Sequence, residues 1–377
     1  MTGSGGVRHL YVHLPFCASR CGYCDFVTVV GRAGQHRAYV DALLKELALE
    51  RHRLAPRLES VFIGGGTPTF TEGPELERLL LALPPAEELT VEANPETVRL
   101  ATAGLLRACG VTRVSLGAQS FRPRLLEILE RRAGPDDVRR AVYALRDAKF
   151  DNISLDLVYG IPGQSPADLE ADLSDALALE PEHLSCYELE AKEGTRFTHA
   201  HGAELARQAE AMESYFERVV ARVTAAGYRW YETANFCRPP DLADGRDLRS
   251  RHNLAYWRGR DYLGLGIGAV STIERRRWRT TPRLGEYFRA LATGHSPARE
   301  VEELALEVQE RERVLLGLRL DEPLELAGLE RAVEWAAVER LRRLGLVRGS
   351  GASPERALAL TRRGRFLGGG VTAELLA

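Results

Sequence analysis

Three cysteines stand within the eight residues CASRCGYC, as Cys17, Cys21 and Cys24. Thiolates bind soft metals, so this spacing indicates a metal or redox site. Structural zinc needs four ligands, commonly from two C-x-x-C motifs. No second C-x-x-C motif follows here, and His36 could be a fourth ligand only at an unusual spacing. A four-iron cluster on three thiolates would leave one iron open to a substrate. The spacing favours the cluster, with zinc as the alternative.

Composition limits where such a site can work. The chain has 377 residues, six cysteines and a formal net charge of −2. It has no run of the ~18 apolar residues that a spanning helix requires, and its N-terminus lacks a secretory apolar run, so we expect a cytoplasmic protein without a transmembrane segment. Its cysteines are then reduced, and the widely spaced Cys109, Cys186 and Cys237 are expected to be packed thiols.

Elements that would position the cysteines alternate along residues 1–240. Short β-branched or aromatic runs occupy 9–14, 60–66, 88–94, 112–120, 152–160 and 183–190, with a seventh candidate at 228–236. Helical spacing of apolar residues fills 36–54, 99–110, 135–149 and 165–179. This alternation predicts an α/β fold built as a full or partial parallel (β/α) barrel, similar to a TIM barrel. An open doubly wound sheet is the alternative, but no G-x-G-x-x-G follows the first strand.

The rest of the chain differs in pattern. We expect residues 241–300 to form a basic segment that packs on the barrel. Residues 301–377 read as a small helical domain with a winged pair of strands in 345–367. Winged domains often bind DNA, but this one has 12 arginines and 13 acids, so it lacks the charge that phosphate binding requires and no nucleic-acid partner is expected.

Polar residues gather where the predicted strands end. Gly64 to Thr67 follow the second strand, Glu92 ends the third, Gln119 ends the fourth and Asp156 lies in the fifth. In a barrel the C-terminal strand ends form one mouth, where active sites are built. Any one of these residues could instead cap a helix or lie in a solvated loop. Their shared position makes a common site the better interpretation.

The pattern C-x-x-x-C-x-x-C, with Tyr23 before its last cysteine, resembles that of radical S-adenosylmethionine (SAM) proteins. The resemblance implies a radical SAM barrel, a [4Fe–4S] cluster on Cys17, Cys21 and Cys24, SAM on the open iron, and an electron donor for the cluster. It also implies that SAM or cluster contacts come from Tyr11, Tyr23, Gly66, Thr67, Glu92, Gln119, Arg131 and Asp156. Arg131 departs from the pattern, because Glu130 and Ala133 replace the usual glycine and histidine, and a solvated helix face is an equal alternative for it.

A narrower resemblance covers residues 11–257. The segments YVHLPFC, GGGTPT, VEANPE, RVSLGAQSF, LDLVYGIPGQ and RHNLAYW are similar, in this order, to the oxygen-independent coproporphyrinogen III oxidase superfamily. Its true oxidases carry a further cysteine where this chain has Phe26. The C-D-F ending and an H-N-x-x-Y-W motif resemble instead the HemW type of haem chaperone, which implies haem as cargo and haem proteins such as respiratory enzymes as recipients. Coproporphyrinogen III oxidation is the alternative, and an RNA-modifying radical enzyme is a third.

The H-N-x-x-Y-W motif consists of His252, Asn253, Tyr256 and Trp257. A neutral imidazole is a common axial ligand of haem iron, and the two aromatic rings could lie against a porphyrin. Residues 246–283 hold ten arginines against three acids, which would suit two propionates. We therefore expect haem at this motif; a capping histidine in a basic surface, neutralised by acids elsewhere in the fold, is the alternative.

Overall fold

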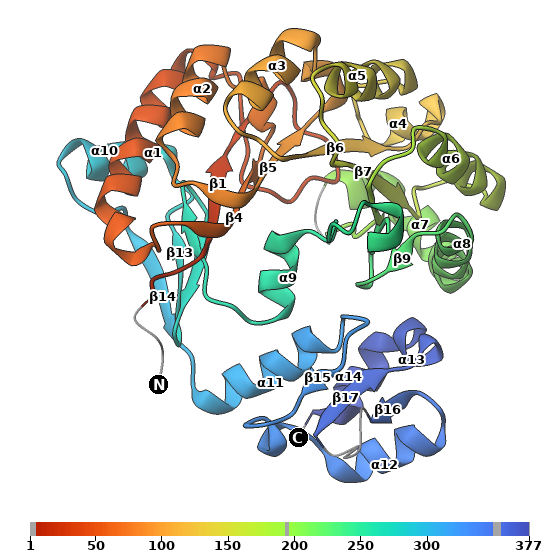
Figure 1. The fold of residues 1–377 in the computed structure, drawn as a ribbon. Coiled ribbons are helices and arrows are strands. Elements are labelled where there is room, and N and C mark those ends of the chain that lie inside the picture. Colours follow the sequence, from red (N-terminus) through yellow and green to blue (C-terminus); the bar gives the residue numbers. More distant parts are fainter. Residues whose placement is uncertain (1–4, 193–195, 350–355, 377) are drawn as a thin grey trace.

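The computed structural model describes residues 5–192, 196–349 and 356–376. Its centre is a curved sheet of nine strands (Figure 1). Seven neighbouring strands run parallel: in spatial order β11 (Leu263–Leu265), β1 (His9–Leu14), β4 (Leu58–Gly65), β5 (Ala86–Ala93), β6 (Arg113–Gln119), β7 (Ile153–Tyr159) and β8 (His183–Glu188). The antiparallel β10 (Asn235–Cys237) and β9 (Arg229–Trp230) complete the sheet. Within the described residues its outer strands do not pair with each other, so the barrel is partial, as predicted.

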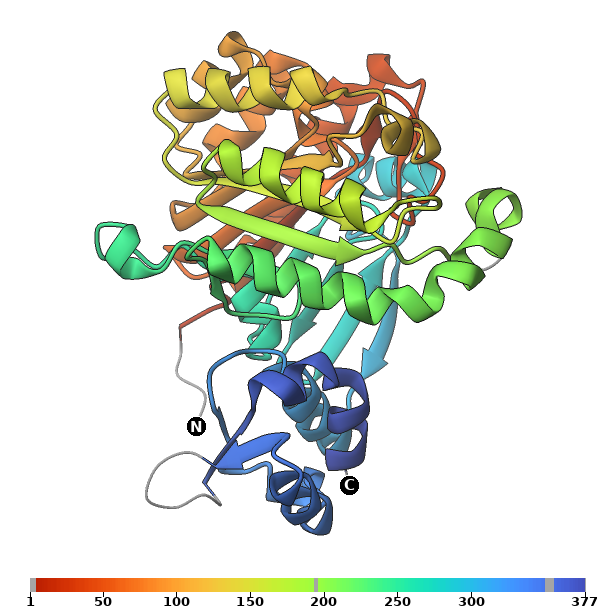
Figure 2. The same ribbon diagram turned by 90° about the vertical axis from the view of Figure 1, so that its right-hand side faces the viewer.

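Helices cover the outer face of the curved sheet (Figures 1 and 2). They are α1 (His36–Glu50), α2 (Gly73–Ala82), α3 (Leu100–Ala108), α4 (Pro123–Ile128), α5 (Pro135–Asp147), α6 (Pro166–Ala178), α7 (Arg196–Gln208) and α8 (Met212–Ala225). The start of α6 is fixed by a capping box. The Ser165 side chain accepts a hydrogen bond from the backbone N–H of Asp168, and the Asp168 carboxylate accepts one from the Ser165 N–H. The four predicted helices are confirmed with ends within about four residues.

The two faces of β6 show how one strand serves both core and site. Its outward residues Val114, Leu116 and Ala118 are buried in the main apolar core. Its inward residues are Arg113, Ser115, Gly117 and Gln119, which are polar or small. Because side chains alternate along a strand, one face packs against the helices while the other lines the barrel interior.

Residues 241–300 contribute to the main sheet. They form α9 (Arg251–Trp257), β11, β12 (Val270–Ile273), β13 (Arg276–Thr280) and α10 (Leu284–Ala292). Strand β14 (Arg299–Glu303), which starts in this segment and ends beyond it, joins β12 and β13 in a three-stranded sheet. Strand β11 pairs with β1 through Leu10↔Leu263 and Val12↔Leu265. The sequence patterns did not predict this strand, because its three residues lie in a glycine-rich run that shows no period of its own.

The C-terminal lobe, formed by the described residues between 306 and 376, lies at the bottom of Figure 2. It contains α11 (Leu306–Gly317), α12 (Trp335–Arg343), α13 (Arg362–Phe366), α14 (Gly368–Leu375) and the sheet β15-β17-β16, formed by Leu324–Glu325, Ala357–Leu360 and Val347–Gly349. Its apolar side chains form their own cluster. Strands β16 and β17 are antiparallel and make up the predicted wing, whose tip lies outside the described residues. No helix in the described ranges is long and apolar enough to cross a membrane.

Candidate functional site

A cavity of about 630 Å³ occupies the barrel interior. It extends from the loop after β1, at the C-terminal strand ends, to α9, which lies near the strand starts. Both the first and the last residue of β6, Arg113 and Gln119, line it. Of the fifteen predicted site residues, fourteen line this cavity: Tyr11, Cys17, Cys21, Tyr23, Cys24, Gly66, Thr67, Glu92, Gln119, Arg131, Asp156, His252, Asn253 and Tyr256.

The cysteine loop, residues 17–28, is closed at its base by a short parallel pair, β2 (Phe16–Cys17) and β3 (Val29–Val30). The Thr67 N–H donates to the Phe16 carbonyl (2.9 Å), and the Cys17 Sγ lies 3.5 Å from the Thr67 Oγ1. The loop is thus fixed to the turn after β4. Burial raises the pKa of the Cys17 thiol, so a bound metal would have to displace its proton.

Other candidates for the metal site lie elsewhere. Cys109, Cys186 and Cys237 do not line the cavity. The His36 ring packs against Phe16, with centroids 4.4 Å apart, and its Nδ1 accepts from the Glu72 N–H (3.3 Å). In the described part of the chain, no three His, Cys, Asp or Glu side chains surround a single metal-ion position. Of the six cysteines, Cys17, Cys21 and Cys24 are the three that line the cavity.

Arg131 lies in the cavity wall beside the cysteine loop. It donates to the Asn94 Oδ1 (2.9 Å) and the Gly117 carbonyl (2.8 Å), and its Nη1 lies 3.7 Å from the Cys21 Sγ. Its Nε is buried without a hydrogen-bond partner. The sequence allowed equally that Arg131 lies on a solvated helix face. That alternative does not hold, because the guanidinium is turned toward the cavity.

The glycines at the end of β4 and directly after it allow two close approaches. A Cβ on Gly66 would lie 2.5 Å from the Pro15 carbonyl, and one on Gly64 would lie 2.7 Å from the Glu92 Oε2. The Gly65 N–H donates to that same Glu92 oxygen (3.1 Å). Glycine at position 66 thus lets the turn pass close to the backbone just before the cysteine loop.

Glu92 and Asp156 are two acids in the cavity wall. Burial, with a contribution from the charge of Asp156, raises the pKa of Glu92 to about 7. Burial also raises the pKa of Asp156, against hydrogen bonds such as that from the Ser115 Oγ (2.9 Å). Two acids that repel each other in a buried site favour a cationic ligand, since its charge would stabilise both ionised forms.

Gln119 has a backbone φ of 64°, a conformation that side-chain-bearing residues rarely adopt. The register of β6 against β7 shifts between Gly117 and Gln119. Such bulges are frequent beside active sites because they redirect a side chain. Here the bulge directs Gln119 into the cavity.

Aromatic rings form the wall around His252. Its ring stacks on Phe62, with centroids 4.9 Å apart, and on Tyr11, with centroids 6.2 Å apart. It meets Tyr256 edge-on at 4.9 Å. Burial lowers the pKa of His252 to about 3, so the imidazole is neutral at physiological pH. Its Nδ1 lies 3.4 Å from the Ser60 Oγ, and its Nε2 is enclosed without a partner. The ring has the protonation state of an iron ligand, but its Nε2 does not reach the cavity surface.

Trp257 does not share the cavity. Its ring lies under the Arg319 guanidinium, 4.4 Å from the ring centroid, in a small cluster between α9 and the C-terminal lobe. The H-N-x-x-Y-W motif is therefore divided between two surroundings. His252, Asn253 and Tyr256 line the cavity, and Trp257 joins α9 to the lobe.

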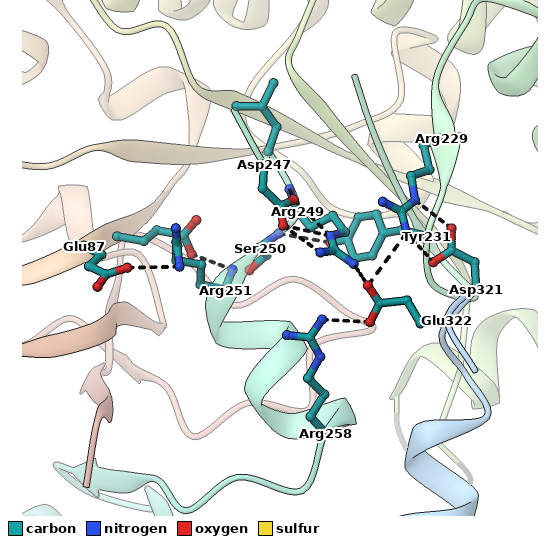
Figure 3. Close-up of polar contacts among 12 residues, drawn as sticks. Glu87, Arg229, Tyr231, Asp247, Arg249, Ser250, Arg251, Arg258, Asp321 and Glu322 are labelled. Carbon is teal, nitrogen blue, oxygen red and sulfur yellow. Dashed lines mark hydrogen bonds and ion pairs between the residues drawn. The ribbon is translucent and has the colours of Figure 1, made fainter. Parts of the chain in front are cut away.

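The basic segment is largely neutralised. Ion pairs to acids involve seven of its ten arginines: Arg246, Arg249, Arg251, Arg258, Arg276, Arg277 and Arg283. Figure 3 shows Glu322 between Arg249 and Arg258, and Glu87 beside Arg251. The expected propionate-binding surface is therefore mostly occupied by the protein's own carboxylates.

The cavity contains further residues that the sequence interpretation missed. Arg113, which is 2% exposed, donates to the Leu248 carbonyl (3.1 Å). His183 and Tyr187 line the cavity from β8. The signal that could have found them is the two-residue alternation of polar side chains along β6 and β8, whose inward positions continue from the strand ends down to the strand starts.

Comparisons with known proteins agree with this architecture. Residues 11–176 match the family model of the radical SAM superfamily. The protein called heme chaperone HemW of Mycobacterium tuberculosis is 37% identical over 380 residues, covering 97% of this chain and 94% of that protein. The Bacillus subtilis protein of the same name is 34% identical over 83% of this chain and 83% of its own length.

A solved structure shows the same fold over nearly the whole chain. The radical SAM coproporphyrinogen III oxidase HemN of Escherichia coli superposes with a TM-score of 0.77, at 22% identity, over 98% of this chain and 90% of its own. At that identity the likeness concerns the fold alone. The fold, the cavity and the relatives that match almost end to end lead to one conclusion: this chain belongs to the HemW family of the radical SAM superfamily.

Proposed function

We propose that this protein is a haem chaperone, which binds haem and passes it to haem-dependent proteins such as respiratory enzymes. The observation that carries the proposal is the match, over 97% of the chain, to relatives that are themselves called heme chaperones. Phe26 supports the same choice, because the related oxidases carry a cysteine at this position. The proposal treats haem as cargo, so its iron is not a resident cofactor of the site.

The same proposal gives the protein a [4Fe–4S] cluster on Cys17, Cys21 and Cys24. The donor set fits, since three thiols line one end of a cavity with Arg131 beside them. When bound, the cluster would supply one-electron reducing chemistry, with electrons from a partner protein. Thr67 and Arg131 would hold the thiol-bearing loop in place.

SAM would fill the deeper part of the cavity. Its sulfonium is cationic, and Glu92 and Asp156 place two carboxylates in the surrounding wall. Tyr11, Gly66 and Gln119 would complete the contacts, with Gly66 leaving room for a close approach of backbone. The roles of these residues rest on the fit between the acidic cavity and the cationic ligand.

The experiment that tests this function offers two ligands in parallel. Anaerobically reconstituted protein, supplied with SAM and a reductant, is given haem in one set of samples and coproporphyrinogen III in the other. We expect stoichiometric haem binding, read from the Soret band, and no conversion of coproporphyrinogen III to protoporphyrinogen. Turnover of coproporphyrinogen III would contradict the proposal and favour the oxidase alternative, which has the same fold.

A further inference from the structure

One buried arginine of the cavity wall has no carboxylate partner. Arg113 is 2% exposed and lines the cavity from the first position of β6. Its Nη1 donates to two neutral oxygens, the Asn152 Oδ1 (3.2 Å) and the Leu248 carbonyl (3.1 Å). Within the described ranges, its Nε and Nη2 donate to no protein atom and the guanidinium forms no ion pair. Buried charges are normally paired, because an unpaired one is costly.

The acids whose charges act on Arg113 are held by other donors. Glu88 accepts from the Arg251 N–H (2.9 Å), and Asp156 accepts from the Ser115 Oγ (2.9 Å). Burial raises the pKa of both acids, so neither is a full counter-charge for the guanidinium. Arg113 therefore differs from the basic segment, whose arginines are mostly paired, in having a charge that a ligand can use.

Arg113 lies beyond the acids proposed to face SAM. Ser115 is in register with Glu92, whereas Arg113 is in register with Thr90. Inward side chains recur at every second residue of a strand, so Arg113 is one inward position nearer the strand starts than Ser115. The three thiols lie at the strand ends, at the opposite end of the cavity. Along the cavity, the charged groups therefore run from the thiols, past two acids, to a cation at the inner end.

Helix α9 adds hydrogen-bonding groups at this inner end. The bond from Arg113 to Leu248 places the guanidinium beside the segment just before α9. Asn253 and Tyr256, three residues apart on α9, line the cavity. In the described part of the chain, the Asn253 amide and the Tyr256 hydroxyl have no hydrogen-bond partner. An amide, a phenol and a guanidinium all donate, whereas a carboxylate only accepts.

We propose that Arg113, with Asn253 and Tyr256, forms a carboxylate subsite at the inner end of the cavity. The free guanidinium nitrogens would donate to the carboxylate, and the amide and phenol would complete its hydrogen bonds. Two sources fit this chemistry: a propionate arm of haem, which rests on the proposed chaperone function, and a free small carboxylic acid, which does not. SAM also carries a carboxylate, but the proposed cluster would hold that end of SAM beside the thiols.

The test changes Arg113 in full-length, cluster-loaded protein without added SAM. Arg113→Gln removes the charge, and Arg113→Lys keeps it. Arg299→Gln is the control, because the Arg299 side chain is 17% exposed, pairs with Glu50 and does not line the cavity. Iron content and circular dichroism show whether each variant is folded.

Two ligand series distinguish the sources of the carboxylate. Haem and haem dimethyl ester, which has no carboxylate, form the first series; isotope-labelled propionate, followed by NMR, forms the second. We expect Arg113→Gln to bind haem or propionate at least about tenfold more weakly than wild type, Arg113→Lys to retain most of the affinity, and Arg299→Gln to match wild type. A loss for haem but not for its ester would identify the propionate arm. A loss for free propionate alone would identify a small acid.

Three results would overturn the inference. The first is that neither haem nor propionate binding depends on Arg113. The second is an equal loss for haem and its dimethyl ester, with propionate unaffected, which would make Arg113 a support for the cavity wall. The third is a matching loss of SAM affinity, which would assign Arg113 to the SAM carboxylate. A wild-type protein that binds no haem would contradict the proposed function, while the propionate series would still test the subsite.

Discussion

Cys17, Cys21 and Cys24 differ from the other three cysteines of the chain in facing a common cavity. If they hold a [4Fe–4S] cluster, changing any one to serine should abolish it, because each would bind a different iron. We expect about four irons and four sulfides per chain in anaerobically purified wild type, and close to none in each variant, by metal and sulfide analysis. Cys109→Ser, a cysteine outside the cavity, is the control and should keep the full content. Zinc in place of iron, or a requirement for Cys109, would show that the assignment is wrong.

Glu92 and Asp156 should contribute through charge. Glu92→Gln and Asp156→Asn keep the side-chain volume while removing a carboxylate that faces the cavity, so each should weaken SAM binding about tenfold or more, by calorimetry on cluster-loaded protein. Glu339→Gln, which removes an exposed carboxylate paired with Arg342 on α12, should leave the affinity unchanged. Wild-type affinity in both cavity variants would remove these two acids from the SAM site.

The site was predictable from the sequence to the extent that it lies at strand ends. Glu92, Gln119 and Asp156 could be placed together because parallel strands end at one mouth. The environment of His252 was not predictable, since its ring meets Phe62 and Tyr11 only through the packing of α9 against β4 and β1. The sequence also could not predict that the arginines of the basic segment are paired with acids. Their acidic partners come from other elements, among them Glu87 and Glu322.

Strand β11 depends on a buried acid of α1. The Glu46 Oε2 accepts hydrogen bonds from the Gly266 N–H (2.8 Å) and the Tyr287 hydroxyl (2.7 Å), and its Oε1 is buried without a partner. Burial raises the pKa of Glu46 from 4.5 to about 7. The folded state thus prefers the protonated acid. The stability that this preference provides is full below pH 4.5 and is lost as pH rises through 7.

Glu46→Gln tests this linkage, because glutamine stays neutral at every pH. The free energy of unfolding of the variant minus that of wild type should rise by about 3 kcal/mol between pH 4.5 and 8 and then level off. Chemical denaturation at a series of pH values measures it, and the difference cancels the groups common to both proteins. A flat difference across this range would mean that the pKa of Glu46 is the same in the folded and the unfolded protein.

The contrast between β1 and β11 shows what the sequence could predict about elements. Strand β1 was predicted at both ends, since His9–Leu14 is an apolar run of full strand length. Strand β11 has three residues and exists through its pairing with β1 and the support of Glu46. Such a strand is defined by long-range contacts, which local sequence patterns do not record.

The C-terminal lobe contacts the cavity wall through α9. Glu322 accepts from Arg249, just before α9, and from Arg258, just after it (2.7 Å), as Figure 3 shows. The adjacent Asp321 N–H donates to the Tyr231 carbonyl (3.0 Å), while the Tyr231 hydroxyl bonds to the His183 Nε2 (2.8 Å). The lobe is therefore joined to two parts of the cavity wall, His183 and the helix that bears His252.

Glu322→Ala should loosen this joint. We expect faster hydrogen exchange at the α9 amides and a free energy of unfolding lower by about 1 kcal/mol, because the pairs are partly exposed. Glu374→Ala, which removes an exposed pair with Arg340 inside the lobe, is the matched control and should leave α9 unchanged. Equal α9 exchange in the two variants would show that the ion pairs do not fasten the lobe to the cavity wall.

Delivery of haem is the central claim for the whole molecule, and one measurement tests it most directly. Haem-loaded, cluster-containing protein is mixed anaerobically with the apo form of a b-type respiratory cytochrome, and the Soret spectra of donor and acceptor are followed over time. We predict that haem leaves this protein and appears in the cytochrome faster than from haem-loaded serum albumin at the same haem concentration. Haem that stays bound, or that moves no faster than from albumin, would contradict a chaperone function.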